Sequence, residues 1–172
     1  QQPELFGIEF QQPEAAVAAI VDFASRRPLT AILPIDDSGV LIAARASQRL
    51  GLPHNDPLAA EAARDKLLMR QLLRDGSVPV PAFHGFAVTD EIEQVTAVVH
   101  SHIGFPCVVK PRTLNGSRGV IRANNAAELT AVIHRVQHLL RPMGAIGFLV
   151  EQFIPGFEVA LDEALTDNSK VV

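Results

Sequence analysis

The chain has 172 residues, of which 48% are hydrophobic and 20% are charged, and its formal net charge is −4. These values are those of a folded globular protein, and they exclude disorder, a collagen helix and a coiled coil. Because the chain has no basic excess, nucleic acid and an anionic membrane surface are not expected partners. The single cysteine, Cys107, lies in an apolar stretch, which predicts a buried thiol, a reducing compartment and hence a cytoplasmic protein.

The first part of the chain is expected to be the end of a small α/β unit. A helix is predicted over residues 14–25, where apolar side chains recur at helical spacing. The continuous apolar run at 29–35 predicts a strand buried on both faces of a parallel sheet. Ser38 is expected to cap a helix that runs to Leu50 and is stopped by Gly51. No stretch has the roughly 18 uncharged apolar residues that a membrane span needs.

The rest of the chain is expected to mix helices and strands. Helices are predicted over 58–74, from a cap at Asp90 to 102, and over 125–140, and strands over 80–86, 105–110, 119–122, 147–154, 158–165 and from 170 onward. The second and third of these strands are expected to form a hairpin with a turn at 115–119. A domain boundary is expected near residues 53–58, which divides the chain into 1–55 and 56–172. The chain lacks an initial Met and ends within a predicted strand, so we expect a fragment.

Two neighbouring features suit a phosphate group. Lys110 ends an apolar strand at the base of the hairpin, seven residues before Ser117, and both side chains can reach one phosphate chain. The loop of Gly116, Ser117, Arg118 and Gly119 offers a hydroxyl and backbone amides that can turn toward an anion. Each feature also has an ordinary interpretation, because a lysine at a strand end usually faces solvent and two glycines usually mark a tight turn.

The strand predicted at 147–154 has the same double interpretation. It ends at a Pro-Gly pair, which is expected to leave the backbone of Gln152 and Ile154 unpaired and able to hydrogen-bond the edge of a flat heterocycle. Seven residues after Glu151, the carboxylate of Glu158 suits a pair of ribose hydroxyls. The alternative is an ordinary hairpin with exposed glutamates.

A fourth stretch, Asp65-Lys66, lies within the helix predicted over 58–74, where a charged pair is usually solvated surface. In chain order, however, these stretches together resemble the ATP-grasp superfamily, and within it the chain is most similar to the carboxylate-amine ligases. The stretches that carry the resemblance are Ala63-Arg64-Asp65-Lys66 with Met69-Arg70, Val78-Pro79-Val80-Pro81, Pro106-Cys107-Val108-Val109-Lys110-Pro111, Asn115-Gly116-Ser117-Arg118-Gly119-Val120 and Val150-Glu151-Gln152-Phe153-Ile154-Pro155-Gly156-Phe157-Glu158. The resemblance extends from about residue 30 to the end of the chain.

The resemblance implies an ATP site. The implied contacts are Lys66 and Lys110 with the phosphates, the flexible loop of Gly116, Ser117, Arg118 and Gly119 closing over them, Glu151, Gln152, Phe153 and Ile154 as the hinge that recognises adenine largely through backbone groups, and Glu158 with the ribose. Two ammonium groups and oriented amides suit a tetra-anionic nucleotide, and a loop that excludes water protects a reactive intermediate.

The resemblance also implies a fold and a reaction. The fold class is α/β to α+β, with the end of a Rossmann-like pre-ATP-grasp unit followed by an incomplete ATP-grasp fold. A small-molecule carboxylate, with amino acids as candidates, would attack the γ-phosphoryl group of ATP in the presence of Mg²⁺. An amine would then displace phosphate from the acylphosphate, which forms an amide or peptide bond.

The resemblance places the family's metal ligands and catalytic residues beyond a point equivalent to Val172. No metal ligand is therefore assigned within the chain, and residues 1–172 alone are expected to bind nucleotide weakly without turnover. Two alternatives stay open, namely a small-molecule kinase with the same fold and a nucleotide-binding module that catalyses nothing. The sequence identifies neither the two substrates nor the oligomeric state.

Overall fold

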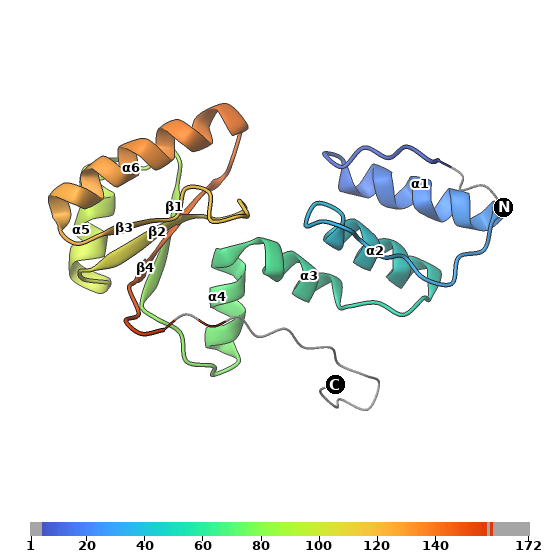
Figure 1. The fold of residues 1–172 in the computed structure, drawn as a ribbon, viewed down its shortest axis with the longest axis horizontal. Coiled ribbons are helices and arrows are strands. Elements are labelled where there is room, and N and C mark those ends of the chain that lie inside the picture. Colours follow the sequence, from blue (N-terminus) through green and yellow to red (C-terminus); the bar gives the residue numbers. More distant parts are fainter. Residues whose placement is uncertain (1–4, 158, 160–172) are drawn as a thin grey trace.

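The computed structural model describes residues 5–157 and 159, which form a pair of helices joined by two further helices to a covered sheet (Figure 1). The helices are α1 (Pro13–Arg26), α2 (Val40–Leu50), α3 (Pro57–Arg64), α4 (Lys66–Asp75), α5 (Ile92–His102) and α6 (Ala126–Leu140), followed by the short 3-10 helix η1 (Arg141–Met143). The strands are β1 (Phe83–Ala87), β2 (Cys107–Pro111), β3 (Ile121–Ala123) and β4 (Gly147–Gln152). The predicted mixed class of helices and strands is confirmed. The strands predicted at 158–165 and from 170 onward lie outside the described residues.

Helices α1 and α2 pack against each other through small and branched side chains. Ala16 and Val17 of α1 meet Ile42 and Ala46 of α2, and all four are buried. The predicted end of α2 is confirmed, because Gly51 closes the helix in the left-handed conformation, with a φ of 66°. We call this helix pair, with the segments that flank it, the N-terminal lobe.

The strand predicted at 29–35 is wrong. This segment forms no strand, and two of its apolar residues are strongly exposed, with Leu33 at 83% and Ile35 at 100%. A strand needs a neighbour with which to exchange hydrogen bonds, and the described part of the N-terminal lobe contains no other strand. Pro34 also lacks the N–H group that a ladder requires.

Two predicted helix caps are also wrong. The N-cap of α2 is Gly39, and the hydroxyl of Ser38 donates to the carboxylate of Asp36 instead. The N-cap of α5 is Glu91, while the carboxylate of Asp90 accepts from a backbone N–H in the preceding turn. In both places the acidic side chain stabilises the turn before the helix rather than the end of the helix.

The single helix predicted over 58–74 is two helices, because the backbone breaks at Asp65, with a φ of −107° and a ψ of 104°. The carboxylate of Asp65 accepts hydrogen bonds from the N–H groups of Leu67 and Leu68, so it caps α4. On the other side of the break, α3 packs against α2 through Ala60. The break therefore separates a helix held by the N-terminal lobe from a helix held by the sheet.

The sheet has the strand order β1-β4-β2-β3, and each neighbouring pair is antiparallel. The predicted hairpin is confirmed as β2 and β3. Across β2 and β4, Val108 lies opposite Glu151 and Lys110 lies opposite Leu149. Since side chains alternate between the faces of a sheet, these four residues share one face.

Each face of the sheet is covered by different helices (Figure 1). On one face α5 and α6 build the main core with the sheet, and its buried members include Val95, Val99, Leu129, Ile133, Val136, Leu140, Phe86, Cys107, Val109, Phe148 and Val150. On the other face, Leu67 of α4 lies so close to Gly85 of β1 that a Cβ atom there would be 2.4 Å from Leu67 Cδ2. Among the described residues, no helix is long and apolar enough to cross a membrane.

Candidate functional site

The face of the sheet that meets α4 carries two of the predicted site residues. Lys110 on β2 and Glu151 on β4 project toward α4, and the Lys110 ammonium donates a hydrogen bond to Oε1 of Glu151. Arg70 of α4 binds the same carboxylate, with Nε 2.8 Å from Oε2 and Nη2 3.3 Å from Oε1. The three side chains therefore join α4, β2 and β4 through one buried carboxylate.

The Glu151 side chain is only 5% exposed, so its charge depends on these partners. Burial alone raises the pKa of a carboxyl group, but the hydrogen bonds and charges of Arg70 and Lys110 outweigh burial and lower the pKa of Glu151. The group is therefore ionised at neutral pH. The sequence assigned Glu151 to an adenine hinge that acts through its backbone, and the structure adds a role for its side chain.

A second ion pair lies at the start of α4. The guanidinium of Arg112 binds both oxygens of Asp65, with Nε 3.0 Å from Oδ1 and Nη2 on Oδ2. The backbone N–H of Lys66 donates to the carbonyl of Arg112 at 3.0 Å. Burial opposes ionisation of Asp65, but the Arg112 contacts and the helix N–H groups lower its pKa overall. The first turn of α4 is thereby fixed to the segment after β2.

The ammonium of Lys66 is bound to a neutral group, the carbonyl of Leu114, at 2.7 Å. Within residues 5–157 and 159 it forms no salt bridge. Burial and then the nearby charge of Lys110 lower the pKa of Lys66, against the weaker opposing effects of Asp65 and Asp37. Lys66 and Lys110, 44 positions apart in the sequence, are thus brought together as the sequence predicted.

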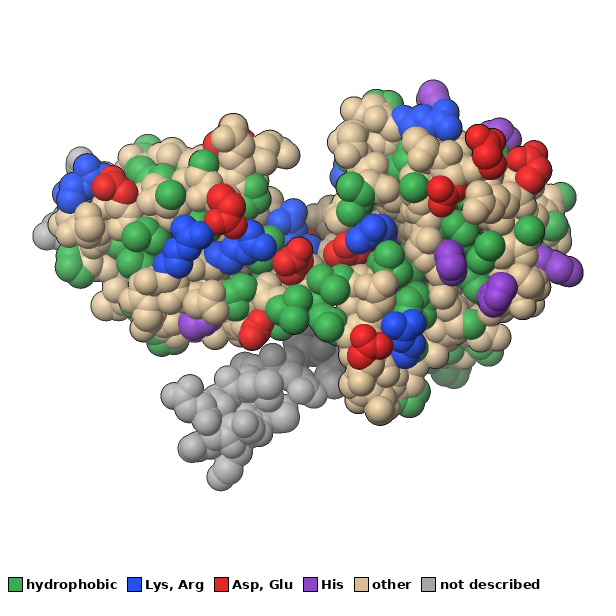
Figure 2. All heavy atoms as spheres, turned by 180° about the vertical axis from the view of Figure 1, so that it is seen from behind, with side chains coloured by type: hydrophobic (Ala, Val, Ile, Leu, Met, Phe, Trp, Pro, Cys, Tyr) green, Lys and Arg blue, Asp and Glu red, His purple; other side chains and the backbone are tan. Residues whose placement is uncertain are grey.

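We call six residues the charged cluster: Asp65, Lys66, Arg70, Lys110, Arg112 and Glu151. Four of them are cations and two are carboxylates, so these six residues have a surplus of two positive charges; the carboxylate of Asp37, which also acts on Lys66, is outside this count. Figure 2 shows charged side chains of both signs gathered in the middle of the molecule, where its two parts meet. A surplus of fixed positive charge in a half-buried place attracts a polyanion.

The predicted loop begins next to this cluster. Gly116, Ser117 and Gly119 all have positive φ angles, at 58°, 55° and 77°. The loop follows Leu114, whose carbonyl holds Lys66, and a groove of about 470 Å³ lies between Arg118-Gly119 and α6. The N–H of Arg118 donates to the carbonyl of Asn115 at 3.2 Å and the N–H of Val120 donates to the carbonyl of Ser117 at 3.1 Å, so these two groups are bonded within a tight turn and are not available to a ligand.

The predicted unpaired backbone is wrong for the N–H of Gln152, and the role of the hinge in adenine recognition stays a prediction. The N–H of Gln152 donates to the carbonyl of Ala82 at 2.9 Å, and the N–H of Phe153 donates to Pro106 at 3.0 Å, so these two groups are not available to a ligand. Gln152 is the last residue of β4 and has a regular strand partner. Ile154 comes after the strand and is 65% exposed. Glu158, the predicted ribose ligand, lies outside the described residues.

Two arginines of the charged cluster, Arg70 and Arg112, are not among the site residues that the sequence predicts. Arg70 lies four residues after Lys66, which is one helical turn, and Arg112 lies two residues after Lys110, which is one strand repeat. Both spacings place the arginine on the same side of its element as the lysine. That periodicity is the signal in the sequence that points to them.

The described residues offer no set of three His, Cys, Asp or Glu side chains that could hold a metal ion. The two carboxylates of the charged cluster are each bound by an arginine. Magnesium, which the resemblance implies, therefore has no fitting ligand set in residues 5–157 and 159.

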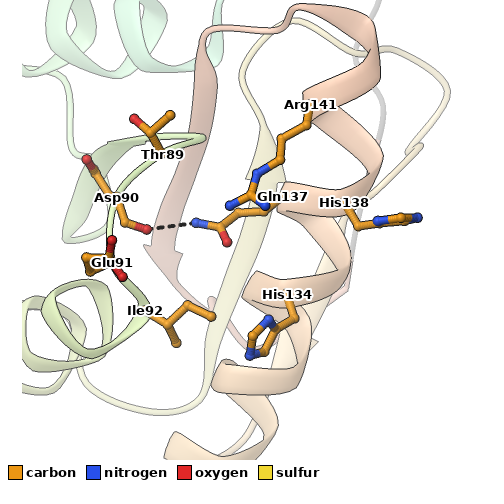
Figure 3. A pocket seen from close by; sticks show the side chains of 8 residues that line it. All are labelled: Thr89, Asp90, Glu91, Ile92, His134, Gln137, His138 and Arg141. Atoms are coloured by element: carbon orange, nitrogen blue, oxygen red, sulfur yellow. Dashed lines mark hydrogen bonds between the residues drawn. The ribbon is translucent and has the colours of Figure 1, made fainter.

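A separate cavity of about 310 Å³ lies between the turn before α5 and helix α6, and none of the predicted site residues lines it (Figure 3). Gln137 reaches across it to the backbone carbonyl of Asp90 at 2.8 Å, while His138 points away. Its charged side chains are of both signs, with Asp90 and Glu91 opposite Arg141. This mixture does not favour a tetra-anionic ligand.

Two families match the sequence of the chain: the ATP-grasp N-terminal domain matches residues 4–54, and the ATP-grasp domain matches residues 103–172. The uncharacterized protein y4rH of Sinorhizobium fredii is 35% identical over 112 residues, which are 63% of this chain and 22% of that protein. A D-alanine–D-alanine ligase of Streptococcus thermophilus is 30% identical over 88 residues, 50% of this chain and 25% of the enzyme. The chain thus spans about a quarter of the length of these relatives.

The fold has solved counterparts as well. The crystal structure of an L-amino acid ligase from Bacillus licheniformis superposes with a TM-score of 0.63 at 24% identity, over 86% of this chain and 32% of that one. At this identity the likeness concerns the fold alone. Together with the sequence matches, it leads to one assignment: the chain belongs to the ATP-grasp superfamily and is similar to its carboxylate-amine ligases.

Proposed function

We propose that the intact protein is an ATP-dependent ligase that joins a small-molecule carboxylate to an amine, with amino acids as the candidate substrates. The observation that carries the proposal is the surplus of two positive charges in the charged cluster. Lys66 and Lys110 lie in a half-buried place beside the loop of residues 116–119, in which Gly116, Ser117 and Gly119 have positive φ angles. The named ligase among the relatives supports the reaction class.

In this proposal the phosphates of ATP lie on Lys66 and Lys110, under the loop of residues 116–119. Each ammonium would form a charge-assisted hydrogen bond to a phosphate oxygen. The backbone after β4, at Ile154, would hydrogen-bond adenine, and Glu158 would bind the ribose. The two N–H groups already bonded within the protein, those of Gln152 and Phe153, take no part.

The proposed chemistry is the transfer of the γ-phosphoryl group to the substrate carboxylate, with ADP leaving, followed by attack of the amine on the acylphosphate and release of phosphate. The lysines would neutralise charge on the phosphoryl oxygens during the first step. No step is assigned to magnesium, because the described residues do not supply its ligands. The domain division at residues 1–55 and 56–172 and a cytoplasmic location remain predictions.

Binding measurements test the phosphate contacts. We expect Lys66→Met and Lys110→Met each to weaken ATP by about 1.5–3 kcal/mol, roughly 10- to 150-fold in Kd, and to leave adenosine unaffected. Arg26→Met is the control, since Arg26 is paired with Asp22 on exposed α1 and its loss also removes one positive charge. Calorimetric titration of all four proteins with both ligands measures the effect. Equal weakening of ATP and adenosine would contradict the assignment of the lysines to phosphate.

Turnover tests the reaction class. The intact protein is incubated with ATP, Mg²⁺ and a pool of amino acids, and ADP, phosphate and amide products are measured with and without an added amine. Phosphate release that requires the amine, together with a new amide, is the expected result. A phosphorylated alcohol would show a kinase instead, and ATP binding without any substrate-dependent ADP would show a module that only binds.

A further inference from the structure

The two arginines of the charged cluster differ from its two lysines in what they bind. Arg112 binds both oxygens of Asp65, and Arg70 binds both oxygens of Glu151. A guanidinium that holds a carboxylate by two parallel hydrogen bonds forms a complete pair, in charge and in geometry. Lys66, in contrast, bonds to a carbonyl group, and Lys110 shares the Glu151 carboxylate with Arg70.

The net charge around the Glu151 carboxylate depends on Arg70. The Glu151 carboxylate carries one negative charge, which Arg70 and Lys110 share. Without Arg70, this 5% exposed carboxylate would have Lys110 as its single cationic partner among the described residues, and that pair would be neutral. The surplus of the cluster would then fall from two charges to one.

Arg70 also fixes the position of the other lysine. It lies one helical turn after Lys66 on α4, so its two hydrogen bonds to Glu151 hold that helix against β4. The Asp65–Arg112 pair holds the beginning of the same helix against the segment after β2. Lys66 thus depends on arginine contacts at α4 for its place beside Lys110, which β2 holds in the sheet.

We propose that Arg70 is a positioning residue for the phosphates of the nucleotide. It neutralises part of the charge of the Glu151 carboxylate, so the positive charge of the Lys110 ammonium is not fully neutralised and can attract the ligand. The inference rests on the proposed function, because it takes the ligand to be ATP. It differs from a purely structural role in one respect. Removal of the Glu151 charge should compensate for the loss of Arg70.

Charge counting gives the design of the experiment. Arg70→Gln lowers the surplus of the cluster from two to one, and the double variant Arg70→Gln with Glu151→Gln restores it to two. Arg70→Lys keeps the surplus at two with a single-point contact in place of the two-point one. Arg74→Gln is the matched control, because Arg74 lies on the same helix but is exposed and paired with Asp75.

The Kd values of ATP and adenosine are measured for the intact wild-type protein and these four variants, with thermal unfolding as the check on folding. We expect Arg70→Gln to lose about tenfold or more in ATP affinity, with adenosine unchanged. The double variant should return to within about threefold of the wild type, Arg70→Lys should lie between the two, and Arg74→Gln should bind as the wild type does.

Two results would overturn the inference. One is a double variant that binds ATP as weakly as Arg70→Gln, and the other is a loss for Arg70→Gln that is equal for ATP and adenosine. If Arg70→Gln does not fold, the comparison of Arg70→Lys with the double variant decides by the same criterion. Absence of ATP binding by the wild type itself would instead overturn the proposed function, and this inference with it.

Discussion

The N-terminal lobe and the sheet region both contain networks of arginine and carboxylate, but in different surroundings. In the N-terminal lobe, Glu14 binds Arg45 at 2.6 Å and Arg49 at 2.8 Å, and its side chain is 64% exposed. In the charged cluster, Glu151 also binds two cations, and its side chain is 5% exposed. The space-filling view shows charged side chains of both signs on the surface of the N-terminal lobe (Figure 2).

The number of salt bridges in a region therefore does not measure how much they contribute to stability. Water solvates Glu14 and Arg49 whether or not they are paired, and Arg45 has a second carboxylate partner in Glu61, so each pair stabilises the fold by little. Water cannot solvate Glu151 in the same way, so removal of any partner leaves a charge without compensation. The same burial that makes the cluster sensitive also makes its surplus charge effective toward a ligand.

Removal of the central carboxylate in each network compares the two directly. Glu151→Ala leaves Arg70 and Lys110 close together and half-buried, and should lower the free energy of unfolding by about 3–5 kcal/mol. Glu14→Ala should lower it by less than about 1 kcal/mol, because Arg49 remains solvated and Arg45 keeps its pair with Glu61. Urea unfolding at neutral pH measures both values. Equal losses for the two variants would show that burial does not separate the networks.

Two glycines compare packing in the same two regions. A Cβ atom at Gly147, at the start of β4, would lie 2.1 Å from the carbonyl oxygen of Phe86, whereas a Cβ at Gly7 would meet nothing within 4 Å. Gly147→Ala must displace β1 from β4 and should cost about 2–3 kcal/mol. Gly7→Ala should change the stability by less than about 0.5 kcal/mol. Urea midpoints of both variants test this, and a stable Gly147→Ala protein would contradict the close packing of the two strands.

The contribution of Glu151 to stability should also depend on pH. The folded protein lowers the pKa of Glu151, so this group stabilises the fold above the ordinary glutamate pKa of about 4.3, and the contribution is lost as the pH falls through the lower folded pKa. The stability advantage of the wild type over Glu151→Gln should therefore shrink between pH 7 and pH 3. Urea unfolding at several pH values gives the difference. A constant difference across this range would mean that Glu151 does not titrate with folding.

The sequence predicts best where structure depends on neighbours along the chain. Helix α1 and the hairpin of β2 and β3 follow from local periodicity and turn residues, and both are confirmed. The segment at 29–35 misleads, because an apolar run predicts a strand only if another strand lies beside it. The helix break at Asp65 is not predicted for a related reason, because Arg112, which binds the Asp65 carboxylate, lies 47 residues away in the sequence.

The site residues also fall into those that the sequence predicts and those that it does not. Lys66 and Lys110 are found from motif order, and the structure brings them together. The role of Arg70 is not predicted, because its partner Glu151 is 81 residues away in the sequence. The unpaired N–H predicted at Gln152 is wrong, because this group bonds to Ala82, on a segment far from it in sequence. Partners of this kind become visible only when the register of the sheet is known.

The break at Asp65 has a mechanical consequence. Helix α3, with 8 residues, is about 12 Å long and packs on the N-terminal lobe, whereas α4 packs on the sheet. The two helices meet at one residue, so a rotation of roughly 10° there moves the far end of α3 by about 2 Å. Asp65 is therefore the hinge point between α3 and α4. Arg112 binds the Asp65 carboxylate beside Lys66, so the angle between the two helices depends on the same charges that surround the candidate site.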